Sequence, residues 1–501
     1  MANVIVADEE DAGLILAAEE CPPDKFLQYH IFSKHDDTII RKLSAHGPVL
    51  IRGGRGSGKS ALLIEAHRRM KAAGSTFSVY MSLRYLPLLQ SDGAEYVGHF
   101  CGLLSKAIAQ EISARGLKAD FQHCENEVDL QHGLNSLSVA LGLRVVILFD
   151  DAAHIGREKP LEAFFDLFRT LSSASVSCKA SIYPGVTKFG VRFDVYNDST
   201  VIDISRVGGV TGASYFYEIL KIRYPVIANE VIFSESIDAE KFSEIIGRSV
   251  VGNMRAFILA CNRFDNKEKI SIPDINACLL AMASDYYWPL MEEVAPKLGV
   301  YEPLIPVAQF VFENIVSHNV RNDETSNHVV NDKTTIHSSV VSKYSKAFEI
   351  LEYLGFLSKL QASRGMKSGG RGPVFAINFC SLLEKMPSSR LTQGMISRWL
   401  SSSSDISEIH SSSGVFEGIQ MPELKESGKL GILSKNIDVL QKSKAYPYGL
   451  TNDKIEKLKS ISIMTVEDIL KSDDESILSL DRVGPITLQR IRDVSYQAVW
   501  M

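Results

Sequence analysis

The chain has 501 residues, of which 45% are hydrophobic and 23% are charged. This ordinary globular composition excludes a disordered, collagenous or low-complexity protein, and at roughly 150 residues per domain the length predicts three or four domains. Lys and Arg number 54 against 60 Asp and Glu, so the net charge of −6 does not indicate nucleic-acid binding, although an acidic total can hide a basic face.

Strands that alternate with helices are expected over residues 1–210. A helical start to about residue 45 is followed by a short apolar strand, a glycine-rich loop and a helix. Another helix is expected from residue 98 to about 112. Further strands are expected at residues 77–83, 143–149, 177–183 and 201–204. This alternation predicts a parallel sheet that helices cover on both faces.

The rest of the chain divides by composition into four parts. The expected parts are a helical lid at 211–300, a helix with a Gly/Arg-rich hairpin at 301–386, a Ser-rich linker at 387–446, and a small helical unit at 447–501. The linker contains one expected short helix. Ser-rich sequence of this kind is typical of flexible connections.

The seven cysteines predict neither a disulfide framework nor a structural metal site. Their number is odd and none forms a C-x-x-C pair, so we expect free thiols in a reducing, cytoplasmic compartment. The start of the chain has no basic residues before its apolar stretch, which argues against a signal peptide. No run approaches 18 apolar residues, so no membrane span is expected.

A glycine-rich loop matches G-x-x-x-x-G-K-[ST] in full and predicts an ATP site. The expected phosphate-binding residues are Gly53, Gly54, Arg55, Gly56, Ser57, Gly58, Lys59, Ser60 and Ala61. Glycines let backbone N–H groups approach phosphates, and the following helix adds the positive end of its dipole. Lys59 is expected to reach the β- and γ-phosphates, and Ser60 to ligate Mg²⁺.

Two acidic residues end the most apolar predicted strand. Asp150 and Asp151 follow Val145–Phe149, and a buried parallel strand delivers such residues to the carboxyl edge of the sheet, where phosphates bind. Asp150 is expected to hold Mg²⁺, and Asp151 to orient or deprotonate the attacking water. Asp151 is one methylene shorter than the glutamate usual in fast ATPases, so we expect slow or partner-dependent hydrolysis.

These motifs resemble the initiator branch of the AAA+ ATPases, the proteins similar to origin-recognition factors. The glycine loop, the Asp-Asp strand end, Tyr215–Arg223 and Gly252–Phe257 carry the resemblance. It implies a helical lid whose Arg255 senses the γ-phosphate, although Asn253 replaces the acid usual in that lid motif. The Asp-Asp ending also resembles the STAND class of regulatory ATPases, which act as switches.

Two further roles at the nucleotide site are expected. Thr187 lies just past the fourth strand and is a candidate polar sensor of the γ-phosphate; the alternative is a plain turn residue. Arg192 follows in a short polar segment and is a candidate arginine finger for a neighbouring subunit. The finger role requires an oligomer.

Residues 337–380 have the helix-plus-basic-hairpin pattern of a winged helix. Over residues 340–400, nine Lys and Arg face three Asp and Glu, a local basic region in an acidic protein. The expected DNA contacts are Ser342, Lys343 and Lys346 on the helix and Arg364, Lys367 and Arg371 on the hairpin. The helix would enter the major groove and the hairpin would meet phosphates or the minor groove. The alternative is a domain used for protein contact.

The last 45 residues or so resemble the helix-hairpin-helix unit of the RNA polymerase alpha subunit's C-terminal domain. Arg482 replaces the leading glycine of the usual hairpin, which is followed by Gly484. Hairpin N–H groups of this fold approach a DNA phosphate, so Arg482, Gly484 and Arg490 are candidate DNA contacts. From residue 450 onward seven Lys and Arg face nine Asp and Glu, so docking to a protein is the alternative.

The sequence therefore predicts a multidomain α/β P-loop NTPase with a helical lid, a winged helix and a small helix-hairpin-helix domain. The leading hypothesis is an ATPase whose nucleotide state controls its binding to double-stranded DNA, with a protein partner or self-association. One alternative is a STAND-like signalling or defence ATPase that oligomerises with ATP and recruits a partner. Another is a loader of a helicase or transposase. The pathway, the preferred DNA and the oligomeric state stay open.

Overall fold

The computed structural model describes most of the chain. The described residues are 15–83, 93–153, 158–186, 189–205, 214–234, 237–321, 329–367, 369–386, 388–401, 406–424, 431–442 and 449–500. Among them, no helix is both long enough and apolar enough to cross a membrane.

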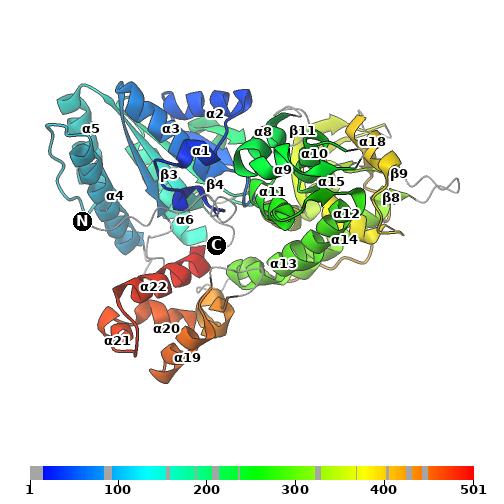
Figure 1. Ribbon diagram of the computed structural model, residues 1–501. Coiled ribbons are helices and arrows are strands. Elements are labelled where there is room, and N and C mark those ends of the chain that lie inside the picture. The colour runs from blue at the N-terminus through cyan, green and yellow to red at the C-terminus, as the bar shows by residue number, and fades with distance from the viewer. Residues whose placement is uncertain are drawn as a thin grey trace.

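A five-stranded parallel sheet occupies the first 205 residues (Figure 1). Its strands are β1 Val49–Arg52, β2 Thr76–Ser82, β3 Arg144–Ala153, β4 Val176–Ile182 and β5 Thr200–Asp203. They lie in the order β2-β3-β4-β1-β5, with every pair parallel. The predicted strands are confirmed, and β1, which leads into the glycine loop, lies in the interior of the sheet.

Helices cover both faces of this sheet, as expected. They are α2 Lys34–Ser44, α3 Lys59–Ala73, α4 Gly93–Ala114, α5 Glu127–Leu141, α6 Glu158–Leu171 and the short α7 Val195–Asp198. Side chains alternate along β3, so Ile147 and Phe149 pack with α4 to α6 on one face and Leu148 with α2 and α3 on the other. The sheet is therefore buried on both sides.

A helical unit follows at residues 214–304. It consists of α8 Ser214–Arg223, α9 Pro225–Asn229, α10 Ala239–Ser249, α11 Met254–Cys261, η4 Asn262–Phe264, α12 Ile272–Met282, the π-helical η5 Ala283–Tyr287, α13 Trp288–Val294, η6 Ala295–Lys297 and η7 Gly299–Leu304. Two short strands, β6 Ile232–Phe233 and β7 Lys269–Ile270, pair in parallel and were not expected. Near the N-terminus, η2 Ala18–Glu20 and α1 Phe26–Tyr29 are held by Arg223 of α8, which donates to the carbonyls of Ile15 and Tyr29.

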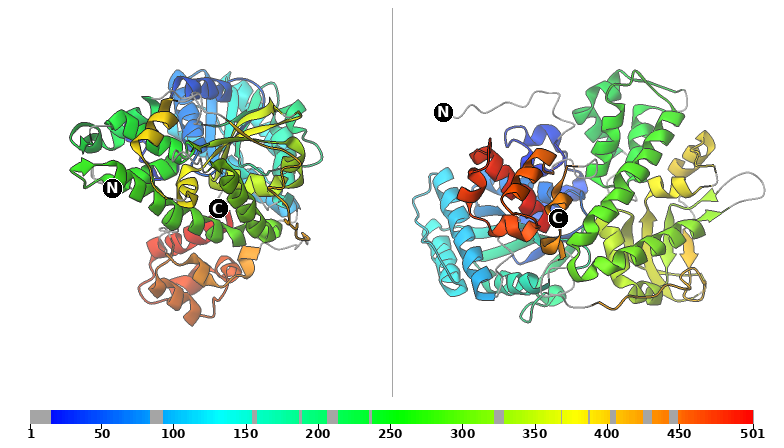
Figure 2. Two further views of the ribbon diagram at one scale, coloured as in Figure 1. Left: turned by 90° about the vertical axis from the view of Figure 1, so that its right-hand side faces the viewer. Right: turned by 90° about the horizontal axis from the view of Figure 1, so that it is seen from below.

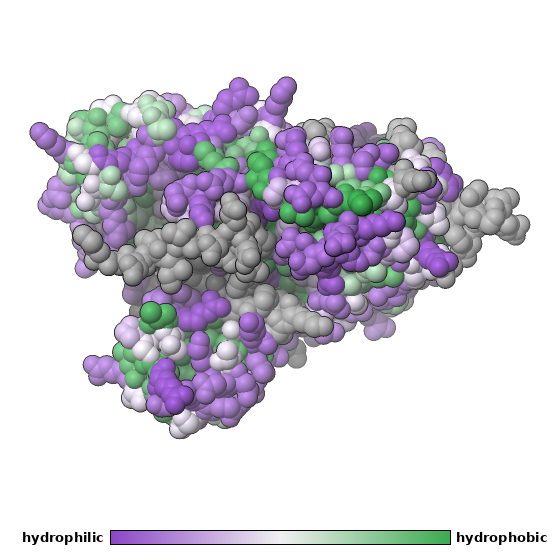
Figure 3. All heavy atoms as spheres, in the orientation of Figure 1, coloured by the Kyte–Doolittle hydropathy of each residue, from purple (hydrophilic) through white to green (hydrophobic). Residues whose placement is uncertain are grey.

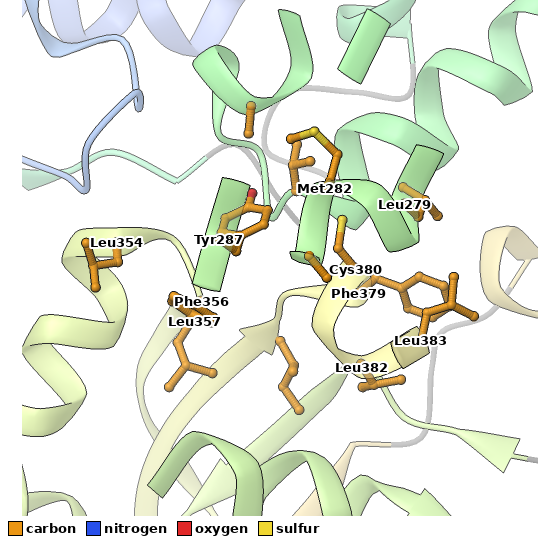
Figure 4. Close-up of a cluster of buried hydrophobic side chains, with 14 of the residues drawn as sticks. Leu279, Met282, Tyr287, Leu354, Phe356, Leu357, Phe379, Cys380, Leu382 and Leu383 are labelled. Carbon is orange, nitrogen blue, oxygen red and sulfur yellow. The ribbon is translucent and has the colours of Figure 1, made fainter. Parts of the chain in front are cut away.

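Residues 305–409 form a second mixed region, here called the hairpin unit. Its elements are α14 Ile305–Asn319, β8 Val320–Arg321, β9 Val329–Val330, β10 Lys333–Ile336, α15 Ser338–Lys343, α16 Ser345–Leu354, β11 Leu357–Gly365, β12 Arg371–Ile377, α17 Phe379–Lys385, α18 Gln393–Ser401 and β13 Ser407–Ile409. The long antiparallel pair β11–β12 is the hairpin that the sequence predicts. Leu279 and Met282 of α12 lie with Phe379 and Leu383 of α17 in one apolar cluster (Figure 4), so the helical and hairpin units share a core.

The segment expected as a Ser-rich linker is instead part of the hairpin unit between residues 388 and 409. Strand β13 pairs in parallel with β10 and closes the four-stranded sheet β11-β12-β10-β13. Trp399 of α18 stacks on Phe379 at 4.3 Å and donates its indole N–H to Asp332 at 2.7 Å. A few apolar side chains are thus enough to hold this Ser-rich segment against the hairpin unit, because each of them packs into the apolar core of that unit.

The C-terminal unit, residues 431–500, projects from the rest of the molecule (Figure 2), and its face in Figure 3 is mainly hydrophilic. It consists of η8 Gly431–Ser434, η9 Ile437–Leu440, α19 Asn452–Ser460, α20 Val466–Lys471, α21 Asp474–Leu478 and α22 Pro485–Trp500. Arg492 of α22 donates to the carbonyls of Ile469 and Ser472 at the end of α20, which ties these helices together. Lys435 pairs with Glu302 of η7 at 3.4 Å and links the unit to the helical unit.

Candidate nucleotide site

The glycine loop runs from the end of β1 to the start of α3. Gly58 precedes the helix with φ +89° and Gly56 has φ +74°, conformations that side chains rarely adopt. A Cβ at Gly56 would also lie 2.2 Å from Oδ1 of Asn253. Glycine is therefore required at position 56 for two independent reasons, its backbone angle and its close neighbour.

Lys59 is buried, with 5% of its surface exposed. Its ammonium donates to the carbonyls of Gly53 at 2.8 Å and Gly54 at 3.0 Å. Burial lowers the pKa of Lys59 to about 8, although the negative charges of Asp151 and Asp150 oppose this shift. The lysine is thus desolvated and directed to the loop's own carbonyls, which anionic phosphates can replace.

Asp150 is fully buried at the carboxyl end of β3. Its carboxylate accepts hydrogen bonds from the Tyr80 hydroxyl at 2.8 Å, the Ser181 hydroxyl at 2.6 Å and the Asp151 N–H at 3.0 Å. Burial and the nearby Asp150 charge raise the pKa of Tyr80 well above its ordinary value, so its hydroxyl stays a donor. Neighbouring strands β2 and β4 therefore position a carboxylate at the edge where the glycine loop begins.

Asp151 sits in a local distortion of β3. Its φ is +50°, a left-handed conformation that aspartate tolerates better than most residues. The pairing of β3 with β4 breaks here, since Phe149 to Ala153 on β3 spans only Ala180 to Ile182 on β4. This bulge redirects Asp151, whose Oδ1 accepts a hydrogen bond from the Tyr183 hydroxyl at 3.3 Å.

Glu19 is a site residue that the sequence analysis missed. Ligand oxygens of Glu19, Asp150 and Asp151 all lie within 4.8 Å of one another, the only such group of metal-binding side chains found among the described residues. Hard carboxylate oxygens are the donors that Mg²⁺ prefers, so this donor set fits the ion expected with ATP. The sequence carries no signal for Glu19, because η2 lies 130 residues from Asp150 and only the tertiary fold brings them together.

The helical unit contacts the loop through the start of α11. Asn253 caps this helix by accepting from the Ala256 N–H at 3.1 Å, and its side-chain amide donates to the Arg55 carbonyl at 2.8 Å. An acid at position 253 could make only the first of these bonds. Arg255 lies beside the loop as well, since a Cβ at Gly56 would lie 2.9 Å from its Cβ, and its buried Nε has no hydrogen-bond partner among the described residues.

The hairpin unit also reaches the glycine loop. The Arg55 N–H donates to the Tyr353 carbonyl at the end of α16, at 2.9 Å. A Cβ at Gly54 would lie 2.5 Å from the Glu352 carbonyl oxygen, so only glycine permits this approach. The loop is thus held between the helical unit on one side and the hairpin unit on the other.

Two further residues were expected to act at a nucleotide site, Thr187 at this one and Arg192 at that of a neighbouring subunit. Thr187 is outside the described residues. Arg192 is on the surface, with 65% of its side chain exposed. Its guanidinium lies 3.9 Å from Glu127 and its N–H donates to Asp166, so its described contacts are with the α5 and α6 region and not with the glycine loop.

The expected DNA contacts divide into exposed and engaged residues. The hairpin residues Lys367 and Arg371 are exposed and Arg364 is half-buried, while Ser342 and Lys343 are exposed near the start of α16. Lys346, by contrast, has 17% of its side chain exposed; it donates to the Gly185 carbonyl at 2.7 Å and pairs with Glu349 at 3.1 Å. The ammonium of Lys346 is therefore bound to Gly185, which follows β4, and does not project freely into solvent.

The C-terminal hairpin presents its candidate residues to solvent. Arg482 has φ +58°, the left-handed conformation for which a glycine is usual, and 86% of its side chain is exposed. A Cβ at Gly484 would meet no other group within 4 Å. Arg490 is half-buried on α22, while the neighbouring Arg492 is engaged by the end of α20.

The five-stranded parallel sheet with helices on both faces, and the glycine loop between β1 and α3, define the chain as a multidomain α/β P-loop NTPase. No protein-family model matches the sequence and no curated protein matches it.

Several solved structures of initiator proteins are similar to the chain. Cdc6p from Pyrobaculum aerophilum is 14% identical, over 77% of this chain and 96% of that one, with a TM-score of 0.32. The Aeropyrum pernix Orc1 protein in complex with DNA is 14% identical over 74% and 96%, with a TM-score of 0.32. The ADP form of Aeropyrum pernix ORC2 is 12% identical over 78% and 98%, with a TM-score of 0.33. Similarity at this level assigns neither a family nor an activity to the chain.

Proposed function

We propose that the chain binds and slowly hydrolyses ATP, and that its nucleotide state controls its engagement with double-stranded DNA. The observation that carries the proposal is the meeting of four groups from distant segments at one sheet edge. These groups are the glycine loop with Lys59, the buried Asp150, the redirected Asp151, and Arg255 from the helical unit.

Each group has a role in converting ATP and water to ADP and phosphate. Lys59 neutralises negative charge on the β- and γ-phosphates. Arg255 adds a positive charge beside the transferred phosphoryl group, where negative charge builds up in the transition state. Ser60, Asp150 and Glu19 would hold Mg²⁺, which supplies charge neutralisation and orientation of the phosphates. Asp151 orients the attacking water, accepts its proton and later returns it.

The DNA-binding part of the proposal is supported by the exposed basic residues of the hairpin unit. From α14 through β12 its elements are a helix, the short strand pair β8–β9, strand β10, two helices and a hairpin; apart from the β8–β9 pair this is the order expected of a winged helix. Lys367 and Arg371 on the hairpin reach solvent, where phosphates can meet them. The motif resemblance to initiator-type AAA+ ATPases favours the same use.

A second candidate is a STAND-like switch that oligomerises with ATP and recruits a protein partner. The contact of α16 with the glycine loop favours this candidate. A phosphate-binding loop that another unit holds in place is better suited to a protein that switches between two states than to an enzyme with continuous turnover. Size-exclusion chromatography separates the two functions. The switch requires a nucleotide-dependent increase in mass, whereas nucleotide-controlled DNA binding does not.

Two measurements test the leading proposal. Lys59→Ala should abolish binding of a fluorescent ATP analogue, while Lys42→Ala, which changes an exposed lysine on α2, should leave it unchanged. Fluorescence anisotropy with a labelled duplex at physiological salt should show DNA binding that differs between ATP and ADP. A Lys59→Ala protein that binds ATP like the wild type would exclude the site, and no duplex affinity in any nucleotide state would exclude the DNA function.

A further inference from the structure

A tight turn after β4 links the nucleotide site to the hairpin unit. It contains Tyr183, Pro184, Gly185 and Val186, and the Val186 N–H donates to the Tyr183 carbonyl at 3.5 Å. Proline at the second position and a glycine with φ +87° at the third are the signature of a type II turn. The proline fixes its own φ, which limits the conformations open to this turn.

Tyr183 faces the nucleotide site through two contacts. The Lys59 ammonium lies 3.7 Å from the centre of the Tyr183 ring, within the range of a cation–π interaction. The Tyr183 hydroxyl donates to Asp151 Oδ1 at 3.3 Å. The ring and the loop carbonyls thus surround the Lys59 ammonium, and an incoming phosphate competes with both for it.

The same turn contacts α16 through two further contacts. The Tyr183 and Tyr353 rings pack edge to face, with centroids 5.0 Å apart, and the Gly185 carbonyl accepts from Lys346 at 2.7 Å. Lys346 lies in the first turn of α16 and Tyr353 in its last, so the helix is held at both ends. Lys346 is also the α16 lysine expected to reach DNA.

We propose that Tyr183 is a positioning residue that transmits nucleotide occupancy to α16. When phosphates draw the Lys59 ammonium away from the ring, Tyr183 loses one of its two contacts with the nucleotide site, the turn shifts, and Lys346 is released from the Gly185 carbonyl. Nucleotide binding therefore frees the basic start of α16 for a polyanion. This inference rests on the proposed nucleotide site and names how that site is regulated.

Hydrogen exchange of the full chain measures this coupling directly. In the wild type, the non-hydrolysable ATP analogue AMP-PNP should raise amide exchange over residues 345–354. Tyr183→Ala should show the raised exchange without nucleotide and should bind AMP-PNP about tenfold more tightly, because the empty state loses its cation–π contact. Tyr183→Phe keeps the ring and should resemble the wild type in both measurements. Tyr196→Ala is the matched control, since Tyr196 is exposed on α7.

Two results would overturn the coupling while leaving the nucleotide site intact. One is a wild type that binds AMP-PNP with no change in exchange over residues 345–354, and the other is a folded Tyr183→Ala protein that matches the wild type. If Tyr183→Ala does not fold, Lys346→Met cuts the same link at its other end and should raise α16 exchange without nucleotide; unchanged exchange there also refutes the proposal. A wild type that binds no AMP-PNP would instead refute the proposed function itself.

Discussion

The depressed pKa of Lys59 predicts that nucleotide binding takes up a proton. Burial lowers this pKa to about 8, so about half of the amine is neutral at pH 8. Phosphate oxygens favour the charged form and raise the pKa in the complex. Affinity should therefore fall as the pH rises above 8, by the factor 1 + 10^(pH − 8), which is about 2 at pH 8 and about 11 at pH 9.

Isothermal titration with AMP-PNP in buffers of different ionisation enthalpy measures this uptake. We expect Lys59 to take up about 0.5 proton per nucleotide at pH 8 and about 0.9 at pH 9, after subtraction of the protons that the free AMP-PNP phosphates carry at each pH. Lys179 provides the control, because burial lowers its pKa to about 8 too. Its ammonium donates to the carbonyls of Ala45 and Gly47, away from the site, so Lys179→Met should leave the uptake unchanged.

Zero uptake at pH 8 to 9, together with equal affinity at pH 7 and 9, would refute the reasoning. It would mean that Lys59 is already fully charged before the nucleotide arrives, and hence that the loop carbonyls and the nearby carboxylates outweigh its burial. If proton uptake disappears in Lys179→Met, the proton binds to Lys179 and not to Lys59. Either result can be read only alongside unchanged far-UV circular dichroism.

Three further predictions concern packing at the glycine loop, packing in the hairpin unit, and two buried histidines. Gly54→Ala places a methyl group against a backbone carbonyl of α16 and should cost about 1–3 kcal/mol in urea unfolding, whereas Gly394→Ala, with open space, should cost nothing. Trp399→Ala should cost about 3–5 kcal/mol by the same measurement; a segment acting as a linker would show no loss. Burial lowers the pKa of both His30 and His67 to about 4. As the pH falls below 6.5 the unfolded chain binds protons at these histidines before the folded protein does, so the free energy of unfolding should fall between pH 6.5 and 4. Equal urea midpoints at pH 7 and 5 would contradict this.

Local spacing was sufficient to predict the α/β core and the glycine loop. A strand, a glycine loop and a helix follow one another without a gap, so the positions of Lys59 and Ser60 depend on neighbouring residues alone. Asp150 was predictable for a similar reason, because a buried parallel strand brings its last residue to a known edge.

The sequence was less informative wherever a contact joins distant segments. Strand β13 was missed because Ser-rich sequence resembles a linker, and only the free edge of β10 gives it a partner. Lys346 is basic in the sequence, but its ammonium is engaged by a turn 161 residues away.

The sequence by itself determined the class of the protein, since the parallel sheet and the glycine loop are specified by hydrophobic periodicity and local turn chemistry. Only the tertiary structure decided which groups complete the site. The carboxylate of Glu19 lies beside those of the two aspartates, the Tyr183 ring contacts the Lys59 ammonium, and a carbonyl of α16 accepts a hydrogen bond from the glycine loop. The physical reason is that long-range contacts depend on shape and burial, which many different residues can satisfy, so no short pattern in the sequence marks them.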